Sequence, residues 1–373
     1  MDQLVVNHSR IISEFEELAS IDAESFSERQ IADVLKKKLS EIGFDIEEDC
    51  AGEKYGGNAG NIYGYLKGEI QGDSILLSAH MDTVSPGIGK RVVIHDDGII
   101  TSAKGTVLGA DDVSGLVEIL EGIRLIRENH IPHRDIEILF PIGEEAYIKG
   151  TRVFDFAKVK SKEAYVLDMS GKIGSAALQA PSLISFQITV KGKAAHAGFE
   201  PEKGINAIEI VSCAISKIKQ GHIDEETTVN IGTITGGVAT NIVSEECICN
   251  GEVRSYNHKN ALEATEQLKE VFITEAEKQG AGINIDVEIN MEAYKIQEEE
   301  NVVQRFIRAC QKLELPYTLT TTFGGSDNNN FVKNGIRGIV LSCGMYNVHS
   351  VEEYTTIKDL EDGARLVAAL IKL

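Results

Sequence analysis

Apolar residues recur with two different periods along the chain, and these periods predict its secondary structure. Helical spacing is clear in residues 28–44 (ERQIADVLKKKLSEIGF) and 110–129 (ADDVSGLVEILEGIRLIREN). Short apolar runs typical of strands occupy residues 74–82 (SILLSAHMD) and 135–145 (DIEILFPIGEE), and residues 91–102 (RVVIHDDGIITS) predict a hairpin. Strands that alternate with helices favour an α/β sandwich with a largely parallel sheet.

A different order of elements is predicted for the middle of the chain. Between residues 183 and 296 the pattern runs strand, helix, strand, strand, helix, strand. This is the β-α-β-β-α-β order of a ferredoxin-like α+β domain. The alternation of helices and strands resumes afterwards. We therefore expect one α/β domain, formed by residues 1–180 and 297–373, that is interrupted by an inserted domain of residues 181–296.

Length, charge and cysteine content narrow the class of protein. A chain of 373 residues is long enough for about two domains. Its formal net charge of -21 opposes binding to nucleic acid and to anionic membrane surfaces. The first residues are acidic where a signal peptide would be basic, and no apolar run approaches the length of a membrane span. The six cysteines show no C-x-x-C spacing, so we expect a soluble cytoplasmic protein with reduced thiols.

Polar side chains interrupt the apolar pattern where predicted strands end or a helix begins. His80 and Asp82 close the run LLSAHMD, and because strand side chains alternate, both face the same side. The other interruptions are Asp111 and Asp112 in LGADDVSG, Glu144 and Glu145 in FPIGEEAYIKG, Asp168 in YVLDMSG and His349 in NVHSVEEY. Each alone has an ordinary explanation: Asp111 could be a helix N-cap, and adjacent glutamates usually face solvent. Gathered in the crevice where open α/β sheets hold ligands, however, these carboxylates would repel one another unless cations were bound.

The chemistry of these residue types predicts a two-metal centre. Two histidines and three carboxylates fit two divalent ions of the zinc class, with one carboxylate bridging them. Ions about 3.5 to 4 Å apart activate a shared water near neutral pH. Glu144 and Glu145 leave a strand in different directions, so one can bind metal while the other accepts the proton of the water. Asp82 is placed to accept a hydrogen bond from the second imidazole nitrogen of His80 and so to fix its ring.

Eight stretches, in this order, make the chain resemble the M20 family of dinuclear zinc peptidases, and most closely its peptidase T (tripeptidase) branch. They are SAHMDTV, TVLGADDVSG, IGEEAYIKG, VLDMSG, GKAAHAGFEPEKGINAI, GGVATNIV, GGSDNNNF and NVHSVEEY. The resemblance covers almost the whole chain. It implies an α/β sandwich catalytic domain of the zinc-peptidase type, interrupted by an inserted ferredoxin-like domain that acts as a lid and often as a dimerisation surface.

The resemblance also implies a role for each matching residue of the metal centre. His80 and Asp168 would complete a first zinc site, Glu145 and His349 a second, Asp111 would bridge the two, Glu144 would be the general base, and Asp82 would support His80. The expected cofactors are two divalent ions, zinc first, with manganese or cobalt as alternatives.

Three residues of the inserted domain match residues of the family's lid. His196, in AAHAG, resembles the histidine that supports the oxyanion, and Asn241 and Arg254 resemble residues that grip the substrate. Alternatives remain open at this point. Arg254 could instead pair with an acid of its own domain, Asn241 could shape the turn after Gly236 and Gly237, and His196 could be a loop residue without substrate contact.

Together these features predict a metallo-aminopeptidase that releases the N-terminal residue of short peptides, with tripeptides as the expected substrates. The same metal site would also serve an aminoacylase, a deacetylase or a carboxypeptidase-like amidase. A non-catalytic metal-binding protein is the alternative from another class. The expected partners are a short peptide and a second copy of the chain, bound through the inserted domain. The glycine-containing stretches are neither Rossmann nor Walker patterns, which argues against a nucleotide-binding protein.

Overall fold

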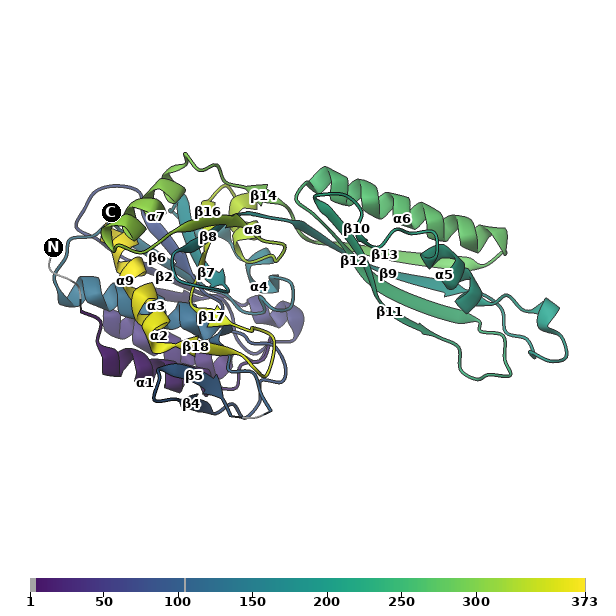
Figure 1. The fold of residues 1–373 in the computed structure, drawn as a ribbon, viewed down its shortest axis with the longest axis horizontal. Coiled ribbons are helices and arrows are strands. Elements are labelled where there is room, and N and C mark those ends of the chain that lie inside the picture. Colours follow the sequence, from purple (N-terminus) through teal and green to yellow (C-terminus); the bar gives the residue numbers. More distant parts are fainter. Residues whose placement is uncertain (1–4, 104, 373) are drawn as a thin grey trace. The chain divides into compact units, whose positions relative to one another are not determined.

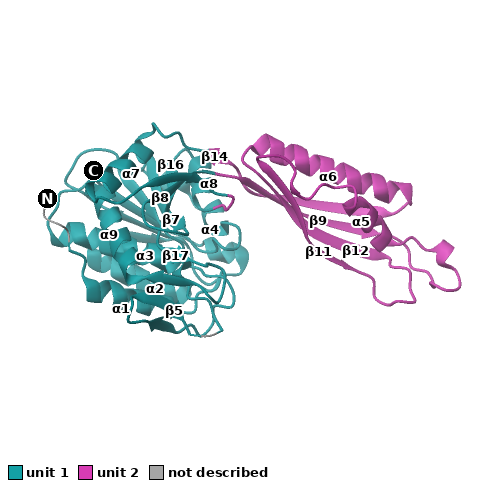
Figure 2. Ribbon diagram, in the orientation of Figure 1, with its two compact units in different colours: residues 1–179, 295–322, 326–373 teal, residues 180–294, 323–325 magenta. Residues whose placement is uncertain are grey.

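The computed structural model describes residues 5–103 and 105–372, which form two compact units (Figure 2). The first unit contains residues 1–179, 295–322 and 326–373, and the second contains residues 180–294 and 323–325. The chain thus leaves the first unit, builds the second and returns. The predicted fold class, an α/β domain interrupted by an inserted α+β domain, is confirmed.

The first unit is built on a nine-stranded mixed sheet (Figure 1). Its strands are β1 (Asp45–Glu48), β2 (Ile62–Leu66), β3 (Ile75–Ser78), β6 (Ile136–Phe140), β7 (Glu163–Met169), β8 (Ser175–Ala180), β14 (Tyr294–Lys295), β15 (Thr318–Thr321) and β16 (Arg337–Ser342). The order is β1-β2-β6-β3-β7-β16-β8-β14, with β15 paired to β8. The four central strands, β6, β3, β7 and β16, are parallel, so their carboxyl ends meet at one edge.

Helices cover both faces of this sheet. They are α1 (His8–Ala19), α2 (Arg29–Ile42), α3 (Ala110–Glu128), α4 (Lys149–Arg152), α7 (Asn301–Lys312), α8 (Asn328–Lys333) and α9 (Ile357–Lys372), with short 3-10 turns at Ala51–Tyr55 and Phe156–Lys158. The buried Tyr165 of β7 donates to the carbonyl of Val302 in α7, whereas its neighbour Val166 packs with Phe331 of α8 on the opposite face. The alternation of strand side chains therefore fills two cores, one on each face.

A small second sheet lies beside the main one, in the order β17-β18-β5-β4. Its strands are β4 (Val92–Ile94), β5 (Ile99–Ser102), β17 (Met345–Tyr346) and β18 (Tyr354–Thr356). The pairing of β4 with β5 confirms the predicted hairpin. The loop between β17 and β18 carries His349.

The second unit is an antiparallel sheet with two helices on one face (Figure 1). Its elements are β9 (Ser182–Lys191), a 3-10 turn (Pro201–Lys203), α5 (Ala207–Ile215), β10 (Gly221–His222), β11 (Thr227–Gly236), β12 (Glu246–Ser255), α6 (His258–Lys278) and β13 (Gly282–Met291). The strand order is β10-β11-β12-β9-β13, in which only the two-residue β10 is added to the predicted β-α-β-β-α-β pattern. A core that includes Phe186, Val211 and Phe272 lies between the sheet and the helices. Across the described part of the chain, every helix is too short or too polar to cross a bilayer.

Candidate metal centre

The first part of the centre forms where two parallel strands end side by side. Ser78, the last residue of β3, pairs with Val166 of β7, so two residues further on His80 reaches the level of Asp168. The Nε2 atom of His80 lies 3.8 Å from Oδ1 of Asp168. His80 is 2 % exposed. The strand register therefore brings these two side chains to the carboxyl edge of the sheet, where parallel α/β folds hold ligands.

Asp111 lies between the two histidines of the centre. Its Oδ1 is 3.1 Å from Nε2 of His80, and its Oδ2 is 3.2 Å from Nε2 of His349. The ordinary explanation of Asp111 as an N-cap fails, because the residue that caps α3 is Gly109 and the backbone at Asp111 is not helical. The carboxylate is thus aimed at two imidazoles and not at the amides of its own helix.

Glu145 completes a second group of donor atoms with His349. Its Oε1 lies 3.0 Å from Nε2 of His349. In the described part of the chain, His80, Asp111 and Asp168 form one group of ligand atoms within 4.8 Å of one another, and Asp111, Glu145 and His349 form another. A third combination, His80 with Glu144 and Glu145, is equally close. Imidazole nitrogens and carboxylate oxygens in groups that share one carboxylate fit a pair of divalent ions.

Three acids of the centre have raised pKa values when no cation is present. Burial, reinforced by the charge of Asp168, raises the pKa of Glu144 well above its usual range. Burial also raises the pKa of Asp168 and Glu145. Several carboxylates are too close together and too far from water to ionise together. A bound cation would remove this cost, because it favours their charged forms.

The two imidazoles and the carboxylate of Asp111, unlike the three acids above, favour their charged forms. Hydrogen bonds to Asp111 and Glu145 raise the pKa of His349 to about 10. Burial opposes charge on His80, but hydrogen bonds to Asp111 and Asp82 still raise its pKa well above the usual range. Burial likewise opposes charge on Asp111, yet His349 and His80 lower its pKa. Without a metal, the surroundings favour the protonated form of both rings, and a metal would have to compete with these protons.

Asp82 supports His80 in a different way from the one expected. The atom closest to Nδ1 of His80 is the backbone carbonyl oxygen of Asp82, at 2.9 Å, while its carboxylate lies at 3.5 Å. The carboxylate instead accepts hydrogen bonds from the amides of Glu144 and Glu145 and from the hydroxyl of Ser25. Asp82 therefore orients His80 mainly through its main chain, and its side chain holds the turn that presents the two glutamates.

Three further acids belong to the surroundings of the centre, although the sequence assigned them no role. Glu353 accepts hydrogen bonds from the amides of Gly109 (2.7 Å) and Asp111 (2.9 Å) and so fixes the loop that carries Asp111. Glu28 accepts one from the amide of Gly143, next to Glu144. Asp327 is 2 % exposed, accepts a hydrogen bond from Thr151, and has its pKa raised by burial to about 7. The sequence feature that could have pointed to Asp327 is its position in GGSDNNNF, just before a helix.

The three predicted lid residues all lie in the second unit. His196 forms an isolated β-bridge with Ile242, and the amide of Ala197 donates to the carbonyl of Asn241, so His196 and Asn241 are on adjacent segments. The amides of Gly198 and Phe199 donate to Nδ1 of His196, at 3.1 and 3.2 Å. A neutral ring that accepts at Nδ1 carries its hydrogen on Nε2, which is therefore a donor.

Arg254 has partners within its own unit. Its guanidinium pairs with both oxygens of Glu252, at 2.8 and 3.2 Å, and donates to the carbonyl of Phe323. The pairing with a domain acid, which the sequence left open, is thus present. It leaves the guanidinium partly satisfied before any substrate binds.

Comparison with known proteins relates the whole chain to peptidases. The model of the peptidase dimerisation domain matches residues 180–280, and that of peptidase family M28 matches residues 61–202. An uncharacterised protein of Bacillus subtilis, YqjE, is 38 % identical over 99 % of both chains. Among solved structures, aminopeptidase PepT from Bacillus cereus is 36 % identical (TM-score 0.91) and a tripeptidase from Staphylococcus aureus 34 % identical (TM-score 0.94), each over 98 % of both chains.

Proposed function

The chain belongs to the peptidase T-like branch of the M20 peptidases, and we propose that it is a two-metal aminopeptidase that releases the N-terminal residue of short peptides, tripeptides first. The coarser statement, that it is a peptidase, rests on its relatives and fold. Substrate length, the end that is cleaved and the identity of the metal are parts of the proposal. The observation that carries it is the position of Asp111 between His80 and His349, at 3.1 and 3.2 Å.

The proposed ligands divide between two ions that share Asp111. His80 and Asp168 would hold the first ion, and Glu145 and His349 the second. Zinc suits this set of nitrogen and carboxylate oxygen donors best, and manganese and cobalt are alternatives. Two such ions would supply the Lewis acidity that makes water a nucleophile near neutral pH.

Glu144 is the proposed general base. It is buried, it adjoins the donor groups, and the turn that carries it is held by Asp82. Burial and Asp168 make its proton affinity high, which suits a group that accepts a proton from water and then passes it to the leaving amine. Glu145, the next residue, points to His349, so the two glutamates have separate partners.

His196, Asn241 and Arg254 are proposed to bind the substrate. His196 is suited to stabilise an oxyanion because its Nε2 is the donor when Nδ1 accepts two amide hydrogens. Arg254 would bind a peptide carboxylate only by sharing its guanidinium with Glu252. We further propose that the chain forms a homodimer through its second unit, which matches the peptidase dimerisation domain, and that it acts in the cytoplasm.

The proposed function is tested by measuring the metal content of the protein and by comparing its activity on a free and an N-acetylated tripeptide. Protein purified without chelator is analysed by mass spectrometry for metal and is then given a free tripeptide and the same peptide N-acetylated. About two zinc ions per chain, with cleavage of the free peptide only, is the expected result. Cleavage of the acetylated form alone would move the assignment to an acylase or amidase. Absence of metal and activity, even after zinc, manganese or cobalt is added, would favour a non-catalytic protein.

A further inference from the structure

A polar cavity lies in the first unit, at the end of the sheet opposite to the metal centre. Its volume is about 230 Å³, and its lining is Asp73, Ser74, Arg134, Glu163, Asn301, Arg305 and Arg308. Asp73 and Ser74 precede β3, and Glu163 begins β7. Because Asp168 lies five residues further along β7, the cavity and the metal centre are separated by about 17 Å along the strand.

One face of α7 supplies the basic side of this cavity. Asn301, Arg305 and Arg308 occupy positions i, i+4 and i+7 of the helix, which lie on the same side. Asn301 is also the first residue of this 12-residue helix, so free backbone amides and the positive end of the helix dipole are nearby. Arg134 comes from the segment before β6.

The arginines of the cavity are only partly supplied with acceptors. Arg305 is 6 % exposed and bonds to Glu163 through Nε at 3.2 Å, but its Nη1 is buried without a hydrogen-bond partner. Throughout residues 5–103 and 105–372, no carboxylate lies within ion-pair distance of Arg134 or Arg308. A buried guanidinium nitrogen without an acceptor is costly, and the chain has 58 acidic residues that could have supplied one.

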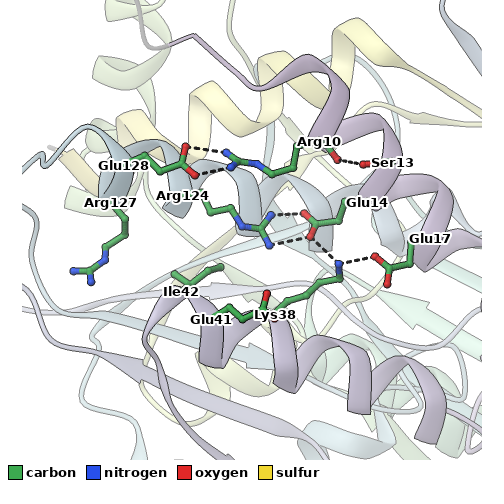
Figure 3. A pocket seen from close by; sticks show the side chains of 10 residues that line it. All are labelled: Arg10, Ser13, Glu14, Glu17, Lys38, Glu41, Ile42, Arg124, Arg127 and Glu128. Carbon is green, nitrogen blue, oxygen red and sulfur yellow. Dashed lines mark hydrogen bonds and ion pairs between the residues drawn. The ribbon is translucent and has the colours of Figure 1, made fainter.

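A larger cavity of the first unit is arranged differently. The cavity between α1, α2 and α3, of about 570 Å³, also contains three arginines and a lysine (Figure 3). There, Arg10 pairs with Glu121 and Glu128, Arg124 pairs with Glu14, and Lys38 bridges Glu14 and Glu17. Its cations are neutralised by the protein itself, except for Arg127, which extends away from these pairs (Figure 3).

We propose that the cavity at the amino ends of β3 and β7 binds a small oxyanion, a phosphate or a carboxylate. Oxygen atoms of such a group would accept hydrogen bonds from the forked guanidiniums of Arg134 and Arg308, and the buried charge of Arg305 behind them would add to the attraction. The lining carries three positive and two negative side chains, so one negative charge balances it. Asp73 and Glu163 favour an anion that also carries a cationic group, such as a free amino acid, over a highly charged one.

The experiment is equilibrium dialysis of the metal-loaded protein against labelled inorganic phosphate and, separately, labelled acetate and glycine. One saturable site per chain is expected for at least one probe. Arg308→Gln, at an exposed position of α7, should weaken binding roughly tenfold or more, since a charged hydrogen bond is lost. Arg134→Gln should do the same, and Arg127→Gln, in the neutralised cavity, should leave binding unchanged.

The probes also separate the sources of the oxyanion. Binding of phosphate alone would identify a phosphate site, while binding of acetate or glycine would identify a carboxylate site, with glycine tighter if the acids take part. The proposal is overturned if no probe binds saturably or if both arginine variants bind the probe as tightly as the wild type does. It is also overturned if the arginine variants still bind the probe and removal of the metal abolishes this binding, because the probe would then occupy the metal centre. None of these outcomes depends on peptidase activity.

Discussion

The carboxylate of Asp82 accepts a hydrogen bond of 2.9 Å from the backbone amide of Glu144. Through its other oxygen, the same carboxylate accepts a hydrogen bond of 3.1 Å from the amide of Glu145. The main chain of Asp82 meanwhile holds the ring of His80. One buried residue thereby sets the position of a proposed metal ligand and of the proposed base, and this relationship can be tested.

Asp82→Asn should weaken metal binding and slow turnover together. An asparagine offers only one acceptor oxygen, so one of the two amides would face an NH2 group. A residue in this supporting position typically changes metal affinity or activity by roughly 10- to 100-fold. Metal affinity is measured by competition with a chromophoric chelator, and kcat on a tripeptide. Ser25→Ala, which removes only the hydroxyl bonded to Asp82, is the control and should have a smaller effect.

Glu144→Gln should retain metal but lose turnover. The amide keeps the size of the side chain and cannot accept the proton, so kcat should fall by about 10²- to 10⁴-fold. Glu145→Gln is the matched control, since its loss should lower metal content as well. Near-normal turnover of Glu144→Gln would remove Glu144 from the role of base.

Metal binding should release protons at pH 7. In the metal-free protein the pKa of His349 is raised to about 10, so its ring is protonated at pH 7, and the pKa of His80 is raised as well. Titration calorimetry in buffers of different ionisation enthalpy counts the released protons. His349→Gln should release fewer protons than the wild type. An equal number of released protons would mean that metal binding does not displace the proton of His349.

Glu28 should make the metal-free protein less stable as the pH rises. Burial, followed by the charge of Asp82, raises the pKa of Glu28 from 4.5 to about 7. The folded state therefore binds the proton more tightly, and the stability gained from it is complete below pH 4.5 and is lost as the pH rises through 7. The difference amounts to as much as about 3 kcal/mol. Glu28→Gln imitates the protonated acid, so its unfolding free energy in urea should lack this decline.

Phe199 should affect catalysis through His196. The two rings lie 4.3 Å apart, although Phe199 is 81 % exposed. Phe199→Ala removes the neighbouring ring and keeps the amide that bonds to Nδ1, so kcat should fall roughly two- to tenfold, the equivalent of the 0.5–1.5 kcal/mol of an aromatic pair. Nitrogen NMR of His196 should still show the hydrogen on Nε2, and Phe199→Tyr should restore kcat. An unchanged kcat for Phe199→Ala would separate Phe199 from the reaction.

The sequence could predict those parts of the site that regular strands position. Because parallel strands end at one edge, residues that follow β3, β6 and β7 converge, and His80, Glu144 and Asp168 could be grouped from the sequence. Glu353 and Asp327 could not, since they lie in irregular segments where no period indicates direction. The pairing of Arg254 with Glu252 was within reach, because residues two apart on a strand share a face.

The detailed roles of acids depended on contacts that a linear pattern does not contain. From the sequence, Asp111 was as well suited to cap a helix as to bind a metal. Only the positions of Gly109 and of the two histidines exclude the capping role. The alternation of strand residues correctly predicted that Asp82 faces the same side as His80. It could not predict that Nδ1 of His80 lies closer to the carbonyl oxygen of Asp82 (2.9 Å) than to its carboxylate (3.5 Å).

The interruption of the first unit also sets the order in which the centre can be completed during synthesis. Of the proposed metal ligands, His80, Asp111, Glu145 and Asp168 precede the inserted unit, whereas His349 follows it. The inserted unit, which has its own core, must therefore be synthesised before the last proposed donor, His349, is available. A nascent chain that has not yet exposed His349 would hold only part of the proposed donor set, so hydrolytic capacity would arise only after the inserted unit has been synthesised.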